Sequence, residues 1–404
     1  MKLILSNFHY LIITIVLLSL VEGKVNRPTV IVPGMLGSIL DMKLDIKIPQ
    51  PHIYCEKDSD GKFERAWLAP SRYIPEFLDC FMFQFTPTYD PITGWYYNTP
   101  GVEVQAHGWG TTSGFDELDP DLPFGSTYLK PLTDSLKKGG YVEGTNLFGA
   151  PYDWRFAVNA TFIEDMKELV ETAYTKSGSQ AVVITSHSLG CLVTNYFLSE
   201  VSQEWKDKYV YSWIAGSGPW IGSVQAFNGL TQGDNFGMFF VPDSVARVFE
   251  QHSDTTFWVL PNPSFWDSDA TLVSIPEGDY TIKDLGSLIV NNLKLQNAQI
   301  MWDRVIKKVN SLKVPNVDTH LIWSKGINTP IKYKFEKNDM SDDPIMEYSD
   351  GDGTINLVSL EYTSSKWKNS GHKLTTQIWN DVKHQETLTT TEAIKYIYTL
   401  LTEE

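Results

Sequence analysis

Short, mostly apolar runs alternate with helix-like segments along much of the chain. The apolar runs end at turns rich in glycine and serine, which predicts buried strands of a parallel sheet. These runs lie at residues 29–32, 180–185, 210–215 and 319–323. Apolar residues recur at helical spacing in the segments 129–136, 162–174 and 394–401. Strands that alternate with helices predict an α/β fold with a mostly parallel sheet.

Two long segments interrupt this rhythm. Residues 45–105 and 219–318 are irregular and rich in aromatic side chains, so we interpret them as insertions. The core would then consist of residues 24–44, 106–218 and 319–404. Ligands of such folds bind at the carboxyl ends of the parallel strands, so we expect the insertions and the functional site at that edge.

One helix start can be predicted in detail. Thr161 and Glu164 have the spacing of a capping box, in which the threonine side chain and the glutamate side chain satisfy free backbone N–H groups. We therefore expect the helix over residues 162–174 to begin at this pair.

The first 23 residues have the pattern of a secretory signal peptide. Lys2 gives a positive start, residues 11–21 form an apolar run, and Val21 and Gly23 supply small residues for a cleavage site. The run is too short to span a bilayer on its own. An uncleaved signal anchor remains the alternative.

Secretion would expose the three cysteines to an oxidising compartment. Cys55 and Cys80 flank a polar loop and could form a disulfide there. Cys191 lies among apolar residues, so we expect a buried thiol. Asn159 opens the glycosylation sequence Asn-Ala-Thr, which fits the same compartment.

The charge balance argues against a nucleic-acid partner. The 404 residues include 33 Lys and Arg against 49 Asp and Glu, a net charge of -16. An acidic surface repels phosphate backbones. The 13 Trp, 19 Tyr and 20 Phe residues are compatible with an apolar or interfacial substrate.

Ser188 is the candidate nucleophile. It stands between a predicted buried strand and an amphipathic helix, in the sequence Ser186-His187-Ser188-Leu189-Gly190. A serine on a tight strand-to-helix turn is typical of a nucleophile elbow, whose pattern is G-x-S-x-G. Here Ser186 replaces the first glycine, and it is still small. The alternative is an ordinary capping serine.

A serine hydroxyl needs a base and a group that orients the base. In this arrangement the acid and then the histidine follow the serine along the chain. Asp352 lies in a loop after a late strand, and His384 lies in a polar loop before the last helix. We choose these two, with Asp350 and His372 as the alternatives.

Acyl transfer also requires an oxyanion hole. The residue after the nucleophile, Leu189, is expected to supply one backbone N–H. The glycine-rich loop after the first strand is expected to supply the other, and we assign it to Met35. The alternative for this loop is a plain turn at a strand end.

The loop that contains Asp352 also resembles a calcium-binding loop in part. Four residues match ligand positions of an EF-hand, namely Asp350, Asp352, Thr354 and Glu361. However, Ile355 occupies the position at which glycine makes the sharp turn. We therefore expect no metal, and no other cofactor.

Six short motifs occur together in the order found in one known family. They are residues 30–38 (VIVPGMLGS), 150–155 (APYDWR), 187–190 (HSLG), 233–235 (GDN), 350–354 (DGDGT) and His384. From about residue 28 to residue 401 the chain resembles the lecithin:cholesterol acyltransferase-like family, and within it the lysosomal (group XV) phospholipase A2 branch.

This resemblance implies an α/β-hydrolase fold with a catalytic triad of Ser188, Asp352 and His384. It places the oxyanion donors at Met35 and Leu189. It also implies that residues 45–105 form a small membrane-binding insertion and that residues 219–318 form a cap with a lid. The side chains expected to contact membrane or substrate are Trp67, Leu68, Phe77 and Leu78.

The function expected from this resemblance is a serine lipid acyl hydrolase or acyltransferase. It would cleave a fatty acyl ester of a glycerophospholipid at a membrane or lipoprotein surface, and pass the acyl group to water or a lipid alcohol. The enzyme would be secreted, or located in a lysosome or vacuole. The alternatives are an inactive lipid-binding protein of the same fold and a neutral-lipid esterase or lipase.

Overall fold

The computed structural model describes residues 26–119, 121–122, 126–235, 241–295, 297–309, 312–368 and 370–402. The predicted signal peptide, residues 1–23, lies outside the described residues. Within the described part, no helix is long and apolar enough to cross a membrane.

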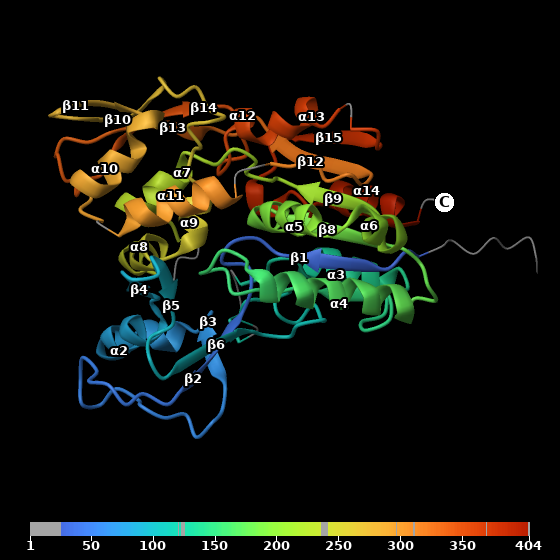
Figure 1. Ribbon diagram of the computed structural model, residues 1–404, viewed down its shortest axis with the longest axis horizontal. Coiled ribbons are helices and arrows are strands. Elements are labelled where there is room, and N and C mark those ends of the chain that lie inside the picture. The colour runs from blue at the N-terminus through green and yellow to red at the C-terminus, as the bar shows by residue number, and fades with distance from the viewer. Residues whose placement is uncertain are drawn as a thin grey trace, which may run out of the picture.

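A central sheet of six strands organises the molecule (Figure 1), and all of its neighbouring strands pair in parallel. In spatial order the strands are β15 (Leu374–Asn380), β12 (Thr319–Lys325), β9 (Val210–Gly216), β8 (Val182–His187), β1 (Thr29–Val32) and β7 (Leu147–Gly149). The predicted α/β class and its four predicted strands are confirmed. The sequence pattern missed the two edge strands, β7 and β15, because β7 is short and β15 alternates between half-buried and exposed residues.

Helices cover both faces of this sheet, and successive residues of each strand face opposite helices. Val30 and Val32 of β1 belong to one buried cluster, whereas Ile31 belongs to another. The first cluster includes α4 (Ala160–Lys176) and α5 (Leu189–Glu200), with α6 (Gln203–Tyr209) packed beside β9. The second includes α3 (Lys130–Lys138) and α14 (Thr391–Thr402). Burial on both faces explains why the four inner strands are mostly apolar, in contrast to the edge strand β15.

The predicted capping box at the start of α4 is wrong. The helix begins at Ala160, and Asn159 is its N-cap, since its side chain accepts a hydrogen bond from the N–H of Phe162 at 3.1 Å. Thr161 therefore already lies inside the first turn. Asn159 remains exposed, so its use as a glycosylation acceptor stays a prediction.

The first insertion forms a small sheet and a helix beside the core (Figure 1). Its elements are β2 (Leu40–Leu44), β3 (Glu64–Trp67), α2 (Pro75–Phe85), β4 (Thr88–Asp90), β5 (Trp95–Tyr97) and β6 (Val102–Ala106). The sheet order β3-β2-β6 extends slightly beyond the predicted boundaries of 45–105. The predicted Cys55–Cys80 disulfide is present and ties the loop before β3 to α2. Cys191 is a buried free thiol, as expected.

The second insertion adds helices and a second sheet. Its elements are α7 (Gln225–Thr231), α8 (Asp243–Gln251), α9 (Asp254–Trp258), β10 (Thr271–Ile275), β11 (Gly278–Thr281), α10 (Leu285–Asn291) and α11 (Ala298–Val309). The sheet order is β11-β10-β13-β14, and its last two strands are β13 (Thr329–Lys334) and β14 (Ile345–Ser349). Residues 329–349, which we assigned to the core, therefore pair with a strand of the second insertion.

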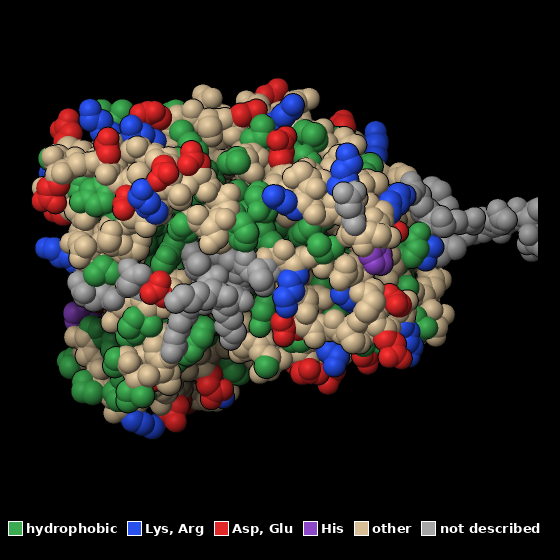
Figure 2. Space-filling model, turned by 45° about the horizontal axis from the view of Figure 1, so that its top comes forward, with side chains coloured by type: hydrophobic (Ala, Val, Ile, Leu, Met, Phe, Trp, Pro, Cys, Tyr) green, Lys and Arg blue, Asp and Glu red, His purple; other side chains and the backbone are tan. Residues whose placement is uncertain are grey.

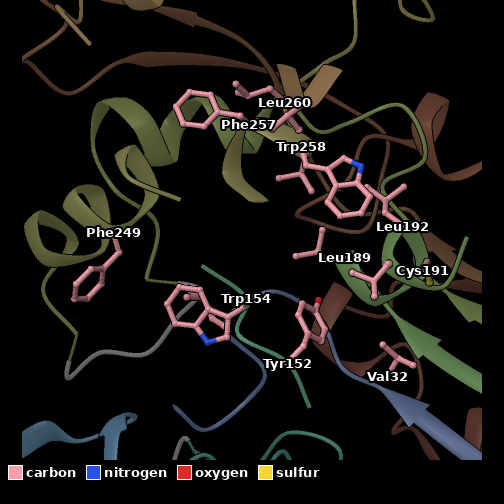
Figure 3. Close-up of a cluster of buried hydrophobic side chains, with 14 of the residues drawn as sticks. Val32, Tyr152, Trp154, Leu189, Cys191, Leu192, Phe249, Phe257, Trp258 and Leu260 are labelled. Atoms are coloured by element: carbon pink, nitrogen blue, oxygen red, sulfur yellow. The ribbon is translucent and has the colours of Figure 1, made fainter. Parts of the chain in front are cut away.

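Aromatic side chains join the core to both insertions, and Figure 3 shows Trp154 of the core with Phe249 and Trp258 of the second insertion. Trp154 of the core packs edge-on against Trp67 at 5.2 Å and Phe85 at 6.3 Å, both from the first insertion. Phe249 of α8 packs against the same two rings at 6.4 and 5.2 Å. Such edge-to-face contacts favour one relative arrangement of the rings beyond the area they bury. The three parts of the chain thus share one hydrophobic cluster.

This packing corrects two of the predicted membrane contacts. Trp67 is 1% exposed and Leu68 is fully buried. The Trp67 indole N–H donates to the carbonyl oxygen of Leu36 at 2.9 Å. Both side chains support the core instead of facing lipid. Aromatic content alone could not separate these internal contacts from an external apolar surface.

Arg155 strengthens the same junction. Its guanidinium is buried and donates to the carbonyl of Phe85 at 2.6 Å and to the side chain of Asn98 at 2.8 Å, both in the first insertion. It also forms an ion pair with Asp153 at 2.7 Å. A buried charge with all of these partners stabilises the junction, because removal of the guanidinium leaves several polar groups unpaired.

We predict that Arg155→Met destabilises the fold by about 3–5 kcal/mol, since it leaves Asp153 and buried acceptors without partners. The matched control is Arg72→Met, which removes a more exposed ion pair with Glu64 at 3.2 Å and one hydrogen bond to the carbonyl of Arg65 at 3.0 Å and should cost about 1–2 kcal/mol. Unfolding of the wild type and the two variants in guanidinium chloride measures both changes in the free energy of unfolding. Equal midpoints for the two variants would contradict the structural role of Arg155.

Candidate active site

Ser188 lies on a strained turn between β8 and α5. Its backbone has φ 55° and ψ -128°, a left-handed conformation that a non-glycine residue adopts at a cost. Its N–H donates to the carbonyl of Gly216 at 2.8 Å. The turn lifts the Ser188 hydroxyl to the carboxyl edge of the sheet, which is the geometry predicted for a nucleophile elbow.

Two glycines allow the loop after β1 to approach this turn. A Cβ atom added to Gly34 would lie 2.9 Å from the Cβ of Ser188, and one added to Gly190 would lie 2.4 Å from the carbonyl oxygen of Pro33. Any larger residue at either position would push the two loops apart. Ser186, at the position of the missing first glycine, fits because its hydroxyl accepts the indole N–H of Trp213 at 2.7 Å.

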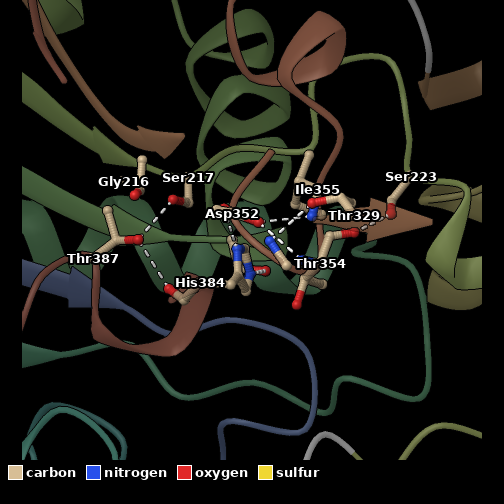
Figure 4. Close-up of polar contacts among 12 residues, drawn as sticks. Gly216, Ser217, Ser223, Thr329, Asp352, Thr354, Ile355, His384 and Thr387 are labelled. Carbon is tan, nitrogen blue, oxygen red and sulfur yellow. Dashed lines mark hydrogen bonds and ion pairs between the residues drawn. The ribbon is translucent and has the colours of Figure 1, made fainter. Parts of the chain in front are cut away.

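Three side chains from distant parts of the chain form one hydrogen-bonded row, and Figure 4 shows two of them, Asp352 and His384. His384 Nε2 lies 2.8 Å from Ser188 Oγ, and His384 Nδ1 lies 2.7 Å from Asp352 Oδ2. A carboxylate only accepts, so Nδ1 carries the proton and Nε2 is left to accept from the serine. The structure therefore brings together the three residues predicted as a triad.

Backbone groups fix the carboxylate of Asp352. Its Oδ1 accepts from the N–H groups of Thr354 at 3.1 Å and Ile355 at 2.7 Å (Figure 4). Asp352 and His384 are 1% and 3% exposed. In such a dry setting, a fully hydrogen-bonded carboxylate stays in place and orients the imidazole.

The alternatives for the acid and the base lie elsewhere. The Asp350 carboxylate is exposed and accepts from the N–H of Gly326 at 2.6 Å. His372 lies 3.7 Å from Asp318. These two residues come just before β15 and β12, at the opposite end of both strands from His384. Neither Asp350 nor His372 contacts Ser188 or His384. In the described residues, no group of three or more His, Cys, Asp or Glu side chains could hold a metal ion.

The two predicted oxyanion donors border the same cavity beside Ser188. Leu189 is the first residue of α5, so its N–H has no partner within the helix. The N–H of Met35 has no acceptor among the described residues, and the turn around it is closed by a bond from Gly37 N–H to the Gly34 carbonyl at 3.1 Å. Both N–H groups are therefore available to an oxyanion, and their role stays a prediction.

Sequence reasoning missed a second polar row behind the first. His187 Nε2 lies 2.9 Å from the carbonyl oxygen of His384, which can only accept, so Nε2 carries the proton. His187 Nδ1 then accepts from the hydroxyl of Tyr128 at 2.5 Å, and that oxygen accepts from Gly34 N–H at 3.0 Å. Burial lowers the pKa of His187 to about 3, which keeps it neutral. This row connects the loop that carries Met35 to the backbone of His384.

The sequence contained no signal for this second row. His187 only adjoins the candidate nucleophile in the sequence, and Tyr128 lies in a loop without a motif. The partners are 59 and 197 residues apart along the chain. Only the tertiary fold brings them together.

The chain is similar in sequence to several known lipid-acting proteins. A family model described as lecithin:cholesterol acyltransferase matches residues 62–311. A lysosomal phospholipase A and acyltransferase of Rattus norvegicus is 30% identical, and the match covers 93% of this chain and 91% of that protein. Lecithin-cholesterol acyltransferase-like 1 of Arabidopsis thaliana is 30% identical, with 89% and 88% covered. Phosphatidylcholine-sterol acyltransferase of Gallus gallus is 30% identical, with 85% and 82% covered.

Among solved structures, a chain of the Tle4–Tli4 complex has a similar fold. The TM-score is 0.50 at 12% sequence identity, and the match covers 93% of this chain and 98% of that one. At this identity the likeness concerns the fold alone. With the parallel sheet and the turn at Ser188, it shows the α/β-hydrolase fold.

We predict that Tyr128→Phe lowers kcat for a soluble ester about tenfold and leaves KM nearly unchanged. The variant removes only the hydroxyl that joins Gly34 to His187, which leaves a buried donor and a buried acceptor unpaired. Steady-state kinetics measure the split between kcat and KM.

The control for this variant is Tyr141→Phe. Tyr141 is buried in the hydrophobic cluster against which Tyr128 also packs, and its hydroxyl donates to the carbonyl of Arg27 at 3.0 Å, away from Ser188. The midpoint temperature of thermal unfolding should change by a similar amount in the two variants. An equal loss of kcat in both would mean that Tyr128 has only a structural role.

Proposed function

The chain belongs to the lecithin:cholesterol acyltransferase family, and on this basis we propose that it is a serine lipid acyl hydrolase and acyltransferase that acts on glycerophospholipid esters. The observation that carries the proposal is the row of hydrogen bonds from Ser188 through His384 to Asp352, with Nε2 at 2.8 Å from Oγ. This geometry suits proton transfer as the serine attacks a carbonyl carbon.

The reaction follows from these contacts. Ser188 Oγ attacks the ester carbonyl while its proton passes to His384 Nε2, and Asp352 stabilises the imidazolium that forms. The N–H groups of Met35 and Leu189 bind the oxyanion. The imidazolium then protonates the leaving lysophospholipid, and an acyl-enzyme remains. Water or a lipid alcohol attacks this ester, gives its proton to His384, and releases the product as Ser188 recovers its hydrogen.

The first insertion is proposed to bind the lipid surface. The Cys55–Cys80 bond holds the loop around residue 53 against α2. Ile53 is fully exposed, and Phe77 on α2 is 51% exposed, whereas Leu78 is half-buried. Apolar side chains gather at the lower left of the space-filling view, over this insertion (Figure 2). Exposed apolar clusters of this kind mark interaction sites.

We place the protein in the secretory pathway, as a secreted or lysosomal enzyme. The name of the Rattus norvegicus relative includes the word lysosomal. The other two relatives are named as lecithin-cholesterol and phosphatidylcholine-sterol acyltransferases. The disulfide supports an oxidising compartment. Residues 45–105 as the membrane-binding insertion and residues 219–318 as the cap with its lid belong to the same proposal.

We predict that Ser188→Ala abolishes both the release of lysophospholipid from phosphatidylcholine vesicles and the labelling by a fluorophosphonate. The neighbouring Ser186→Ala is the control, because its hydroxyl accepts from Trp213 and does not reach His384. It should keep its labelling. If the wild-type protein binds vesicles but neither hydrolyses phosphatidylcholine nor reacts with the fluorophosphonate, it is an inactive lipid-binding protein. If it hydrolyses only triacylglycerol, it is a neutral lipase.

We predict that the double variant Ile53→Ser, Phe77→Ser lowers the affinity for phosphatidylcholine vesicles, measured by co-sedimentation, about a hundredfold or more. Each side chain would lose roughly 1.5–3 kcal/mol of burial in lipid. Hydrolysis of a soluble ester should stay within twofold of wild type. Ile345→Ser is the control, since Ile345 is 63% exposed on β14 of the cap sheet. Undiminished vesicle binding by the double variant would rule out this surface.

A further inference from the structure

Two separate cavities meet at Ser188. The cap-side cavity, about 40 Å3, is bordered by Ser188 and Leu189 and by residues of the cap, among them Ala226 and Val259. The loop-side cavity, about 130 Å3, is bordered by Ser188, His384 and residues of the loops around positions 36, 118 and 127. Of the two, only the loop-side cavity is lined by His384, and only the cap-side cavity is lined by Leu189.

This asymmetry assigns different parts of the reaction to the two cavities. The acyl carbonyl oxygen must point between the N–H groups of Met35, which lines both cavities, and Leu189, which lines only the cap-side cavity. The acyl chain then extends into the cap-side cavity, because the other oxygen atoms of the reaction occupy the side of His384. The entering and leaving oxygen atoms must each exchange a proton with His384 Nε2. They therefore approach from the loop-side cavity. The cap-side cavity is narrow in this state and accommodates only the first carbons of a long chain.

The loop-side cavity also has the surface that an alcohol requires. Leu36 and Leu118 are buried and give it an apolar wall. Thr127 and Gln385 are exposed at its rim, and neither side chain has a hydrogen-bond partner in the described part of the chain. Polar groups of a bound alcohol can thus pair with these two side chains, while its carbon skeleton lies on the leucines.

We propose that the loop-side cavity is the acceptor site, which binds an alcohol with its hydroxyl toward His384 and its carbon chain along Leu118. This proposal rests on the serine mechanism above and adds the place of the acyl acceptor. In the transfer step the alcohol oxygen bonds to the acyl carbon as its proton moves to His384 Nε2. The bond between the acyl carbon and Ser188 Oγ then breaks, and Oγ takes that proton back.

The test uses one acyl-enzyme and several acceptors. The full chain is incubated with p-nitrophenyl butyrate and with methanol, 1-propanol, 1-hexanol or glycerol, and the ratio of ester to butyric acid is measured by chromatography. Because every acceptor attacks the same acyl-enzyme, this ratio reports only on the acceptor step. Wild-type protein should form esters, and formation of no ester with any alcohol would overturn the proposal.

Leu118→Trp fills the loop-side cavity. We expect it to lower the ratio of hexyl ester to acid at least fivefold and to leave the methyl ester nearly unchanged, because methanol and water still fit. The matched variant is Ala226→Leu in the cap-side cavity. It should shift the preference from p-nitrophenyl octanoate toward p-nitrophenyl acetate and leave the acceptor ratios unchanged. The opposite pattern, with Leu118→Trp changing acyl-length preference and Ala226→Leu changing acceptor ratios, would overturn the assignment.

A second variant does not depend on the packing of a large ring. Thr127→Val with Gln385→Leu changes only exposed side chains and removes the rim hydrogen bonds. We expect it to lower glyceryl ester relative to propyl ester two- to fivefold, in line with one or two lost hydrogen bonds. An unchanged ratio would refute the role of the rim. Failure of the proposed function is seen separately, as p-nitrophenol release by wild type no faster than by Ser188→Ala.

Discussion

The backbone of Ser188 is the constraint on which the site depends. Its left-handed conformation is held between a strand that is buried on both faces and a helix that packs on the same sheet. Those contacts hold a strained residue in place, and the strain presents Oγ to His384 without obstruction from the main chain. Gly34 and Gly190 complete the arrangement because they let the loop after β1 lie against the turn.

Around this turn the polar groups form two hydrogen-bonded rows, one for proton transfer and one for positioning. The first row holds the proton that moves, from Ser188 to His384 against the carboxylate of Asp352. The second row, from Gly34 through Tyr128 and His187, fixes the position of the His384 backbone. Because burial keeps His187 neutral, this second row can orient the backbone of His384 without adding a charge beside it.

The two insertions are coupled to the core through apolar contacts. Trp67, Trp154 and Phe249 come from the first insertion, the core and the cap, and they share one cluster. The same Trp67 indole binds the carbonyl of Leu36 in the loop that carries Met35. The surface proposed to meet lipid is therefore joined to the oxyanion loop by packed side chains and one hydrogen bond. A rigid connection of this kind would keep the site assembled during the proposed contact with a lipid surface.

The sequence by itself determined the parts that depend on neighbouring residues. Apolar runs and helical spacing predicted the inner strands and main helices, and turn chemistry singled out Ser188, because such signals are local. Chain order and loop position then indicated Asp352 and His384. Only the tertiary structure decided that Trp67 faces inward, that residues 329–349 join the cap sheet, and that His187 and Tyr128 stand behind the site. These outcomes depend on contacts between residues far apart in the chain, and a linear pattern does not encode which distant surfaces meet.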